Sequence, residues 1–456
     1  MSKRPCFRVP IRQSISLLIL PLVLALTPFR SHAAILEVRE AIRLAVENNF
    51  GLSLSHDQTD LASNAKQGAA GNFLPSASAS VTRSGTFDSN PGVTSLGASA
   101  NWLVFDGFQD YNGYRRAQAQ EQTARLQERQ SLESLLETVV VSYYDIVQQK
   151  QRLEAIRHLL TVSQERANLA QAKLEVGAGS KLEQLQSLSD LNEDSSSYLT
   201  QAVSLATAKV RLNQVMAREP SLEFDVADSI PLEAAPPLDD WRKGLDANNA
   251  SIAAARAQKN ASASSLAEAR GRWLPSLNSG VSYNATPAEL NSAAVPTRSG
   301  FGYNINLSIP LFDRLGTPMA VRSARVGVRT GETRLLQAQS EAASEFEQAR
   351  RQYATALQRI SLEGRNLQVA RQQAEAAQER YKLGASSPLE FRDAQTRLLD
   401  AEGRLISARQ SAKQSEAALQ RLAGYLVRQA PGTYGAGSAP GAPGAPGTRA
   451  DSAGGK

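Results

Sequence analysis

Few side chains in this sequence could perform catalysis. Its histidines are His32, His56 and His158, and nothing in the sequence places two of them at one acid–base or metal site. The stretch Gly177 to Lys181 resembles a phosphate-binding loop, but its spacing misses the P-loop pattern and it follows a predicted helix instead of a strand. We therefore predict that the protein is not an enzyme and binds no cofactor, metal or nucleotide.

Acidic side chains follow two glycine turns that end long proline-free stretches. Glu390 and Asp393 follow Gly384, and Glu183 follows Gly177 in the same way. The helix dipole favours acids in the first turn of a helix, so solvated helix-start acids are one interpretation. Two carboxylates about 6 Å apart repel by roughly 1 to 3 kcal/mol, which can favour cations or hold a divalent ion.

The first 33 residues have the layout of a secretion signal. Basic residues precede an apolar stretch at 15–26, and small residues end at Ala33, after which we predict cleavage. Cleavage removes five of the 50 Lys and Arg residues and no acid, leaving 45 basic against 44 acidic residues. The basic pI therefore gives no reason to expect nucleic acid. The only cysteine, Cys6, is also removed, so we predict export to the periplasm or outer membrane without a disulfide or a lipid anchor.

The two halves of the chain are similar at a nearly fixed offset, which is 200 residues at first and 207 after one loop. The matched residues include Asn48 and Asn248, Asn49 and Asn249, Leu74 and Leu274, Pro75 and Pro275, Phe105 and Phe312, Asp106 and Asp313, Gly177 and Gly384, and Leu212 and Leu419. A period this long indicates two copies of one large unit. We predict repeats at 34–217 and 238–429, a linker at 218–237 and a disordered tail at 430–456.

Each repeat contains two stretches in which apolar and polar residues alternate. They predict strands at about 74–86, 95–105, 274–286 and 300–311. The clearest alternation has the apolar members Phe301, Tyr303, Ile305, Leu307, Ile309 and Leu311. Its eleven residues are about the length that a tilted strand needs to cross a bilayer, so we predict that this face contacts lipid. The alternative is a half-buried strand of a soluble sandwich, which the few strands and long flanking helices disfavour.

The strands are flanked by stretches with helical patterns. Residues 38–70 carry one, and the proline-free stretch 109–175 predicts a helix on the order of 100 Å long. Apolar residues recur every seven positions at Val139, Ile146, Leu153, Leu160, Ala167 and Leu174, and at Phe346, Tyr353, Ile360, Leu367, Ala374 and Tyr381. This spacing is typical of coiled coils. We predict helical hairpins at 109–217 and 314–429, turning at the glycines.

A coiled-coil interface needs a second set of heptad positions beside the first, and in the first long helix this second set is polar. They are Lys150, Arg157, Gln164 and Gln171, so we predict a helix that is wet on one side and packed against two neighbours.

No stretch after the signal reaches the ~20 apolar residues that a transmembrane helix requires. Four strands cannot close a barrel, and open strand edges are not tolerated in lipid. Several chains must then share one barrel.

With these features the sequence resembles the TolC family of outer-membrane efflux proteins. The resemblance covers nearly all of the chain after the signal and rests on the repeated helix–strand–strand–long helix–helix order, the Leu-Pro-Ser strand entries, the Phe-Asp strand exits and the glycine hairpin turns. It implies a mainly α fold with a transmembrane β-barrel. A homotrimer would form a 12-stranded barrel in outer-membrane lipid, continued by an α-helical coiled-coil tunnel across the periplasm. It also implies work with a periplasmic adaptor and an inner-membrane RND or ABC pump.

The resemblance also implies roles for particular residues. The pore aperture corresponds to Tyr381, Glu390, Asp393 and Glu183, where acidic rings narrow the tunnel. The adaptor-docking sites correspond to Val176, Gly177, Ala178, Leu383, Gly384 and Ala385. Ser386 stands where the family pattern has an arginine, so the closed-state linkage of that arginine is not expected here. The rival interpretations are a periplasmic adaptor of the same kind of pump and a soluble scaffold of long helices.

Overall fold

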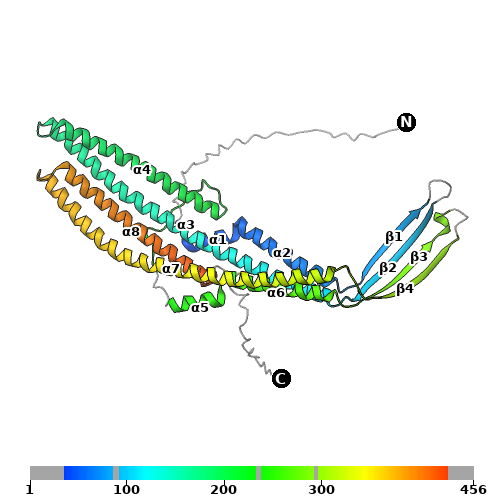
Figure 1. Ribbon diagram of the computed structural model, residues 1–456. Coiled ribbons are helices and arrows are strands. Elements are labelled where there is room, and N and C mark those ends of the chain that lie inside the picture. Colours follow the sequence, from blue (N-terminus) through cyan, green and yellow to red (C-terminus); the bar gives the residue numbers. More distant parts are fainter. Residues whose placement is uncertain (1–34, 86–91, 233–237, 292–295, 430–456) are drawn as a thin grey trace, which may run out of the picture.

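The computed structural model describes residues 35–85, 92–232, 238–291 and 296–429. The protein is long and narrow, with four strands at one end and two helical hairpin turns at the other (Figure 1). The signal peptide and the tail that the sequence predicts lie outside the described residues, as does part of the predicted linker. Among the described residues, no helix is both long enough and apolar enough to cross a membrane.

Helices form most of the described chain. They are α1 (Val38–Asn48), α2 (Phe50–Gly71), α3 (Gln109–Glu175), α4 (Lys181–Val215), α5 (Leu238–Asn248), α6 (Ala250–Gly271), α7 (Gly316–Lys382) and α8 (Pro388–Leu422). The lengths match in pairs: α2 and α6 have 22 residues each, α3 and α7 have 67, and α4 and α8 have 35. The two halves of the chain therefore build the same set of long elements.

The helical pattern of residues 38–70 is divided at Asn49. The backbone there is extended, with ψ 122°, and the side chain accepts a hydrogen bond of 3.1 Å from the amide of Leu52, as helix N-caps do. Asn249 caps α6 through the amide of Ile252 at 3.1 Å. The interpretation of this segment as one helix is therefore wrong, because the asparagine ends α1 and begins α2.

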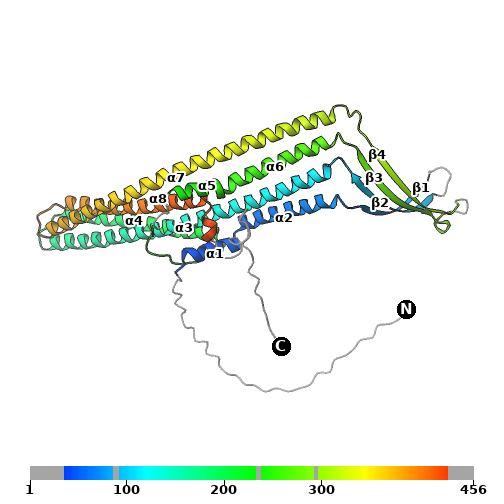
Figure 2. The ribbon, with the colours of Figure 1, turned by 90° about the horizontal axis from the view of Figure 1, so that it is seen from below.

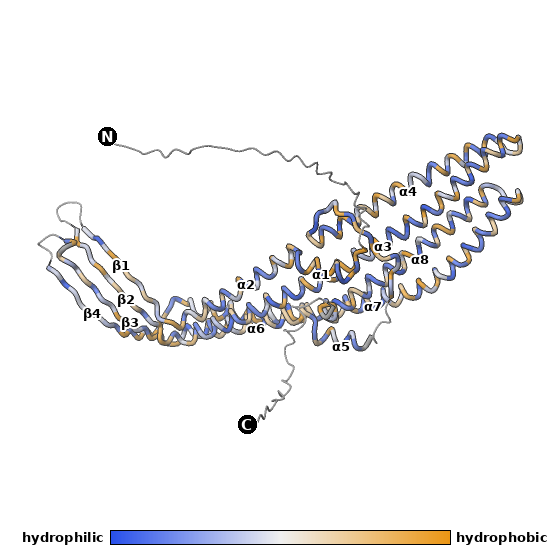
Figure 3. Tube along the Cα trace, turned by 180° about the vertical axis from the view of Figure 1, so that it is seen from behind, coloured by the Kyte–Doolittle hydropathy of each residue, from blue (hydrophilic) through white to orange (hydrophobic). Residues whose placement is uncertain are grey.

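The strands form one antiparallel sheet in the order β1 (Ser76–Ser84), β2 (Val93–Phe105), β3 (Ser276–Thr286) and β4 (Arg298–Ser308). Its pairing register separates two faces: one row holds Ser78, Ser99, Ser282 and Gly302, and the next holds Ala79, Ala98, Tyr283 and Phe301. Figure 3 shows the corresponding alternation of hydropathy along the strands. In this chain the outer edges of β1 and β4 pair with no other described strand.

The strand β4 ends three residues earlier than its sequence pattern suggests. It ends at Ser308, so Ile309 and Leu311 follow the strand, and their predicted place in it is wrong. Pro310 explains the difference, because proline has no N–H to donate to a neighbouring strand. Phe301, Tyr303, Ile305 and Leu307 remain on the apolar face, with 88%, 85%, 71% and 60% of their surface exposed.

Next to the sheet, α2, α3, α6 and α7 lie side by side (Figure 2). Next to the sheet the contacts give the order α2-α3-α6-α7, and toward the hairpin turns they give α4-α3-α8-α7. The side-chain amide of Asn49 donates to the carbonyl of Val215 at 2.9 Å, and that of Asn249 to the carbonyl of Leu422 at 3.1 Å. These bonds join the start of α2 to the end of α4, and the start of α6 to the end of α8. At mid-length, α4 thus takes the place of α2, and α8 takes the place of α6. The long helices α3 and α7 run through both levels.

The main hydrophobic cores lie at this mid-length level. In the first, α1 and the segment after α4 pack on α3, with Leu136, Val139 and Ile146 almost fully buried. In the second, Trp241 of α5 packs on α7 and α8 and contacts the ring of Tyr353 edge-on at 6.0 Å. In each repeat, the short elements therefore pack against the long hairpin at mid-length.

The second buried row of α3 lies one position before the polar residues that its heptad pattern indicates. Arg157, Gln164 and Gln171 are exposed, whereas Ser163 and Ala170 are buried. These buried positions lie three residues after Leu160 and Ala167, which is the usual second position of a heptad. In α7 the same spacing buries Ala349, Ala356 and Ala370. Small side chains at this position let neighbouring helices approach closely.

Candidate functional site

The candidate site is the end of the molecule where both hairpins turn (Figure 1). Gly177 and Gly384 have φ values of +75° and +71°, which glycine adopts without strain. Ser180 and Ser387 then cap the returning helices by accepting from the amides of Glu183 at 3.1 Å and Glu390 at 3.2 Å. We call the last turns of both hairpins the tip.

Tyr381 joins the two hairpins at the tip. Its hydroxyl donates a 3.1 Å hydrogen bond to Glu183 of the other hairpin, and its ring stacks on Phe391 with centroids 5.2 Å apart. The ammonium of Lys173 lies 4.8 Å from the ring centroid, and only 4% of Tyr381 is exposed. Burial, together with the hydrogen bond to Glu183, raises the pKa of Tyr381 to about 12. Of the four predicted aperture residues, the structure brings these two together.

Replacing Tyr381 by Phe is expected to remove one phenol that titrates at unusually high pH. The pKa of a free tyrosine is about 10, so the folded-state value near 12 means that this contribution to stability is complete below about pH 10 and is lost between there and pH 12. When tyrosinate absorbance is followed as the pH rises, the wild type should show a titration phase near pH 12 that Y381F lacks. In E183Q the phase should move toward pH 10, because the neighbouring negative charge is gone. An unchanged phase in Y381F would contradict this assignment.

A second link between the hairpins is ionic and largely buried. Arg392 of α8 donates to both carboxylate oxygens of Asp194 of α4, at 2.7 and 2.8 Å, and lies 3.7 Å from Glu193. The Asp194 side chain is 4% exposed, and it also accepts 2.5 Å from the hydroxyl of Ser163. A bidentate arginine–carboxylate pair with a further donor is the geometry that offsets the desolvation of buried charge.

The neighbouring turn holds another buried ion pair. Arg166 of α3, 3% exposed, donates to Asp190 of α4, one turn before Asp194. Four helices thus contribute polar side chains to one interior cluster at the tip, which we call the tip cluster: Ser163, Arg166, Glu183, Asp190, Asp194, Tyr381 and Arg392. Among these, only Tyr381 and Glu183 were predicted from the sequence.

The other two predicted aperture residues point elsewhere. Glu390 and Asp393 are exposed. Glu390 accepts a 2.9 Å hydrogen bond from the hydroxyl of Ser386. Asp393 forms a 2.9 Å ion pair with Arg397 one turn later on the same helix. Within the described part of this chain neither acid contacts the other hairpin, so they remain available to solvent or to another subunit.

The predicted docking residues form exposed turns. Val176 and Leu383 are 78% and 81% exposed, and no atom lies within 4 Å of the space beside Gly177 or Gly384. Sequence reasoning missed Leu182 and Leu389, which are also exposed beside the turns. The repeat offset could have found them, because they occupy equivalent positions at a separation of 207 residues.

The histidines lie on separate parts of the described chain. His56 bonds to Glu128 at 2.9 Å, and His158 lies 3.6 Å from Glu154. Throughout the described ranges, no group of three His, Cys, Asp or Glu side chains could hold a metal ion. Both histidines therefore act in surface contacts between or along helices.

Comparison with known proteins decides the family. A family model described as outer membrane efflux protein matches residues 41–218 and 241–425. The chain is an outer membrane efflux protein. The two matched ranges correspond to the two halves of the fold, and together they include almost all of the described residues.

Individual outer membrane efflux proteins are similar to this chain at low identity. The curated relative BepC of Brucella suis biovar 1 is 24% identical over 69% of this chain and 68% of its own length. The Campylobacter jejuni CmeC outer membrane channel has a TM-score of 0.77 at 15% identity, covering 85% of each chain. The open state of the Neisseria gonorrhoeae MtrE channel has 0.73 at 16%, covering 86% of this chain and 90% of that one.

Membership of the outer membrane efflux family confirms the resemblance stated from the sequence. It also confirms that the protein belongs to a class of transport channels and is not an enzyme. The adaptor and soluble-scaffold interpretations are rejected on the same finding.

Proposed function

We propose that this chain forms, as a homotrimer, the exit duct of a tripartite efflux pump or type I secretion system. Three four-stranded sheets would close a 12-stranded barrel in the outer membrane, and the helices would continue it as a tunnel across the periplasm. The observation that supports this most is the sheet, which has an exposed apolar face and two outer edges that pair with no other described strand. Such a surface is stable only when lipid covers the face and other strands cover the edges.

The helical layer supports the same assembly. The order α2-α3-α6-α7 leaves α2 and α7 as outer helices, just as β1 and β4 are the outer strands. Leu54 and Leu61 of α2 and Leu336 of α7 are exposed. Contact between α7 of one subunit and α2 of the next would cover these side chains and continue the wall of the tunnel.

The two exposed acids of each tip are proposed to line the aperture. Glu390 and Asp393 would be repeated in every subunit, which places rings of negative charge at the narrowest point. Their mutual repulsion of roughly 1 to 3 kcal/mol per close pair favours cations but does not close the channel. Closure is assigned instead to the contacts of Tyr381 with Glu183 and of Arg392 with Asp194.

Conductance tests both the duct and its aperture. Purified wild-type protein should migrate as a trimer and form cation-selective channels in planar bilayers. The variant E390Q/D393N should still form trimeric channels, but its cation-to-anion permeability ratio should fall several-fold. R397Q serves as the control, because it removes the partner of Asp393 and leaves both acids. A monomer without conductance would reject the duct, whereas unchanged selectivity in E390Q/D393N would reject only the acidic rings.

The exposed turns are proposed to dock the periplasmic adaptor of an inner-membrane RND or ABC pump. Val176, Gly177, Ala178, Leu383, Gly384 and Ala385 would fill grooves of the adaptor, with Leu182 and Leu389 beside them. A tryptophan at Gly384 meets open space but has an unfavourable positive φ. We therefore expect G384W to keep the trimer and to reduce crosslinking to the adaptor at least tenfold. The matched change Q348W, at an exposed position of α7 far from the turns, should leave crosslinking unchanged.

A further inference from the structure

Exposed aromatic side chains gather where the sheet joins the helices. They come from both repeats and are Phe73, Trp102, Phe108, Tyr111, Trp273 and Phe312. Aromatic belts of this kind lie at the boundary between hydrocarbon and headgroups. The junction between strands and helices is therefore the level at which a membrane surface would end.

A chain of contacts connects the apolar face of the sheet to Arg115. Phe105 pairs with Leu277, a residue of the apolar face, and its ring meets Phe108 edge-on at 5.3 Å. Tyr111 lies three residues further along the chain, in the first turn of α3, and is also exposed. The guanidinium of Arg115 then lies 5.9 Å from the centroid of the Tyr111 ring. Arg115 is thus on the membrane side of α3, immediately beyond the aromatic belt.

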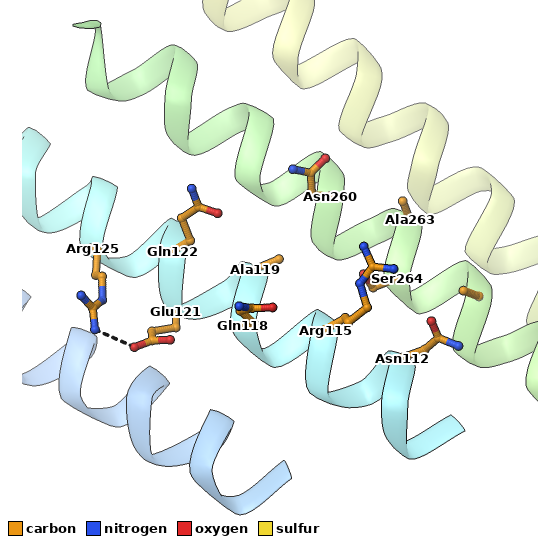
Figure 4. A pocket seen from close by; sticks show the side chains of 11 residues that line it. Asn112, Arg115, Gln118, Ala119, Glu121, Gln122, Arg125, Asn260, Ala263 and Ser264 are labelled. Atoms are coloured by element: carbon orange, nitrogen blue, oxygen red, sulfur yellow. Dashed lines mark hydrogen bonds and ion pairs between the residues drawn. The ribbon is translucent and has the colours of Figure 1, made fainter. Parts of the chain in front are cut away.

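The second repeat places more arginines on the equivalent face. Arg115, Gln118 and Gln122 line a pocket between α3 and α6 (Figure 4). At the offset of 207 residues their equivalents are Arg322, Arg325 and Arg329. These three line a groove of about 480 Å³ between α6 and α7, together with Leu266, Val326 and Val328. The groove is therefore lined by both apolar and cationic side chains.

The first part of α7 carries an excess of positive charge. Residues 314–331 contain four arginines and no acid. Arg115, Arg322 and Arg325 are exposed, and within the described residues none of them forms an ion pair. Arg115 and Arg322 each lie six residues after the first residue of their helix, which is about 9 Å below the belt. A long arginine side chain can extend from there to the headgroup level.

We propose that Arg115, Arg322 and Arg325, which we call the arginine collar, bind the phosphate groups of an anionic phospholipid surface. The planar guanidinium matches phosphate with two hydrogen bonds. The collar would fix the depth of the barrel in the leaflet next to the helices. This inference rests on the proposed function, because the collar borders lipid only if the sheet spans a bilayer.

The test compares lipid headgroups on the intact trimer. Full-length protein in nanodiscs of phosphatidylcholine is titrated with phosphatidylglycerol, and bound lipid is counted by native mass spectrometry. We expect the wild type to prefer phosphatidylglycerol and the variant R115Q/R322Q/R325Q to lose roughly fivefold in affinity for each arginine. R351Q is the matched control: it removes an exposed arginine of α7 about 40 Å further from the sheet than Arg325, and it should keep the preference.

The outcomes separate this inference from the proposed function. Equal binding of both lipids by a wild-type trimer that inserts and conducts would overturn the collar and leave the duct intact. Failure of the wild type to insert would overturn the duct as well. Displacement of phosphatidylglycerol by inorganic phosphate at equal concentration would also overturn the proposal, because it would show a site for the free anion instead of a membrane surface.

Discussion

The variant R392M is expected to weaken the closed tip by about 3 kcal/mol per subunit, because it leaves the buried carboxylate of Asp194 without its cation. If the hairpins separate when the channel opens, this loss shifts the ratio of closed to open states by roughly 100-fold. In planar bilayers the wild type should open rarely, and R392M should be open for most of the recording. Cells that produce R392M should also become sensitive to large antibiotics that enter through the outer membrane.

Two further variants show whether the buried pair causes this effect. In R392M/D194L both charges are replaced by apolar groups of similar size, so closure should largely return. R397Q breaks an exposed ion pair one turn away, with side chains 65% and 59% exposed, and should change the open fraction by less than about twofold. Equal opening in R392M and R397Q would show that the buried pair does not hold the tip closed.

The variant I305R is expected to prevent stable assembly in the outer membrane. Ile305 lies near the middle of β4 on the apolar face and is 71% exposed in the single chain. An arginine on the lipid face near the bilayer centre costs about 2 to 4 kcal/mol, and a trimer would bear this cost three times. Heat-modifiable trimers in outer-membrane fractions should therefore fall at least tenfold, with the chain degraded or left in the periplasm.

The neighbouring residue on the opposite face provides the control. Asn304 shares its row of the sheet with Gly280 and Asn101, on the polar side. N304R should therefore assemble normally and alter only conductance, because its charge would lie in the water-filled interior. If I305R and N304R assembled equally well, the apolar face would not contact lipid.

The long elements could be predicted from the sequence because each has a simple period. Alternation identified all four strands, and the heptads with their terminal glycines identified both hairpins. The divided helix at residues 38–70 was missed, although Asn49 and Asn249 were noticed as repeated residues. An asparagine at this position could have been interpreted as an N-cap, and the structure shows that it also holds the end of a second helix.

The tip cluster was missed for a different reason. Its ion pairs join residues of different helices, and the partners Asp194 and Arg392 lie 198 positions apart. Pattern analysis assigns charged residues to solvent, so it cannot identify charges that are buried together with a partner. The spacing of Asp190 and Asp194, one helical turn apart, was the only local signal. Glu183 and Tyr381 were assigned to the aperture only through the family resemblance, and their contact with each other is seen only in the structure.

The pairing of Arg392 with Asp194 has a consequence for gene duplication. The equivalents of these residues in the other repeat are Leu185 and Ala401, so each hairpin supplies only one partner. In a ring of six identical hairpins, every boundary between neighbours would be the same. All the boundaries would then open together. In the proposed trimer, two diverged copies would create two kinds of boundary between adjacent hairpins: one within each chain, held by the Arg392–Asp194 salt bridge, and one between chains. Such a trimer could open in two steps, first at the boundaries without the salt bridge and then at those with it.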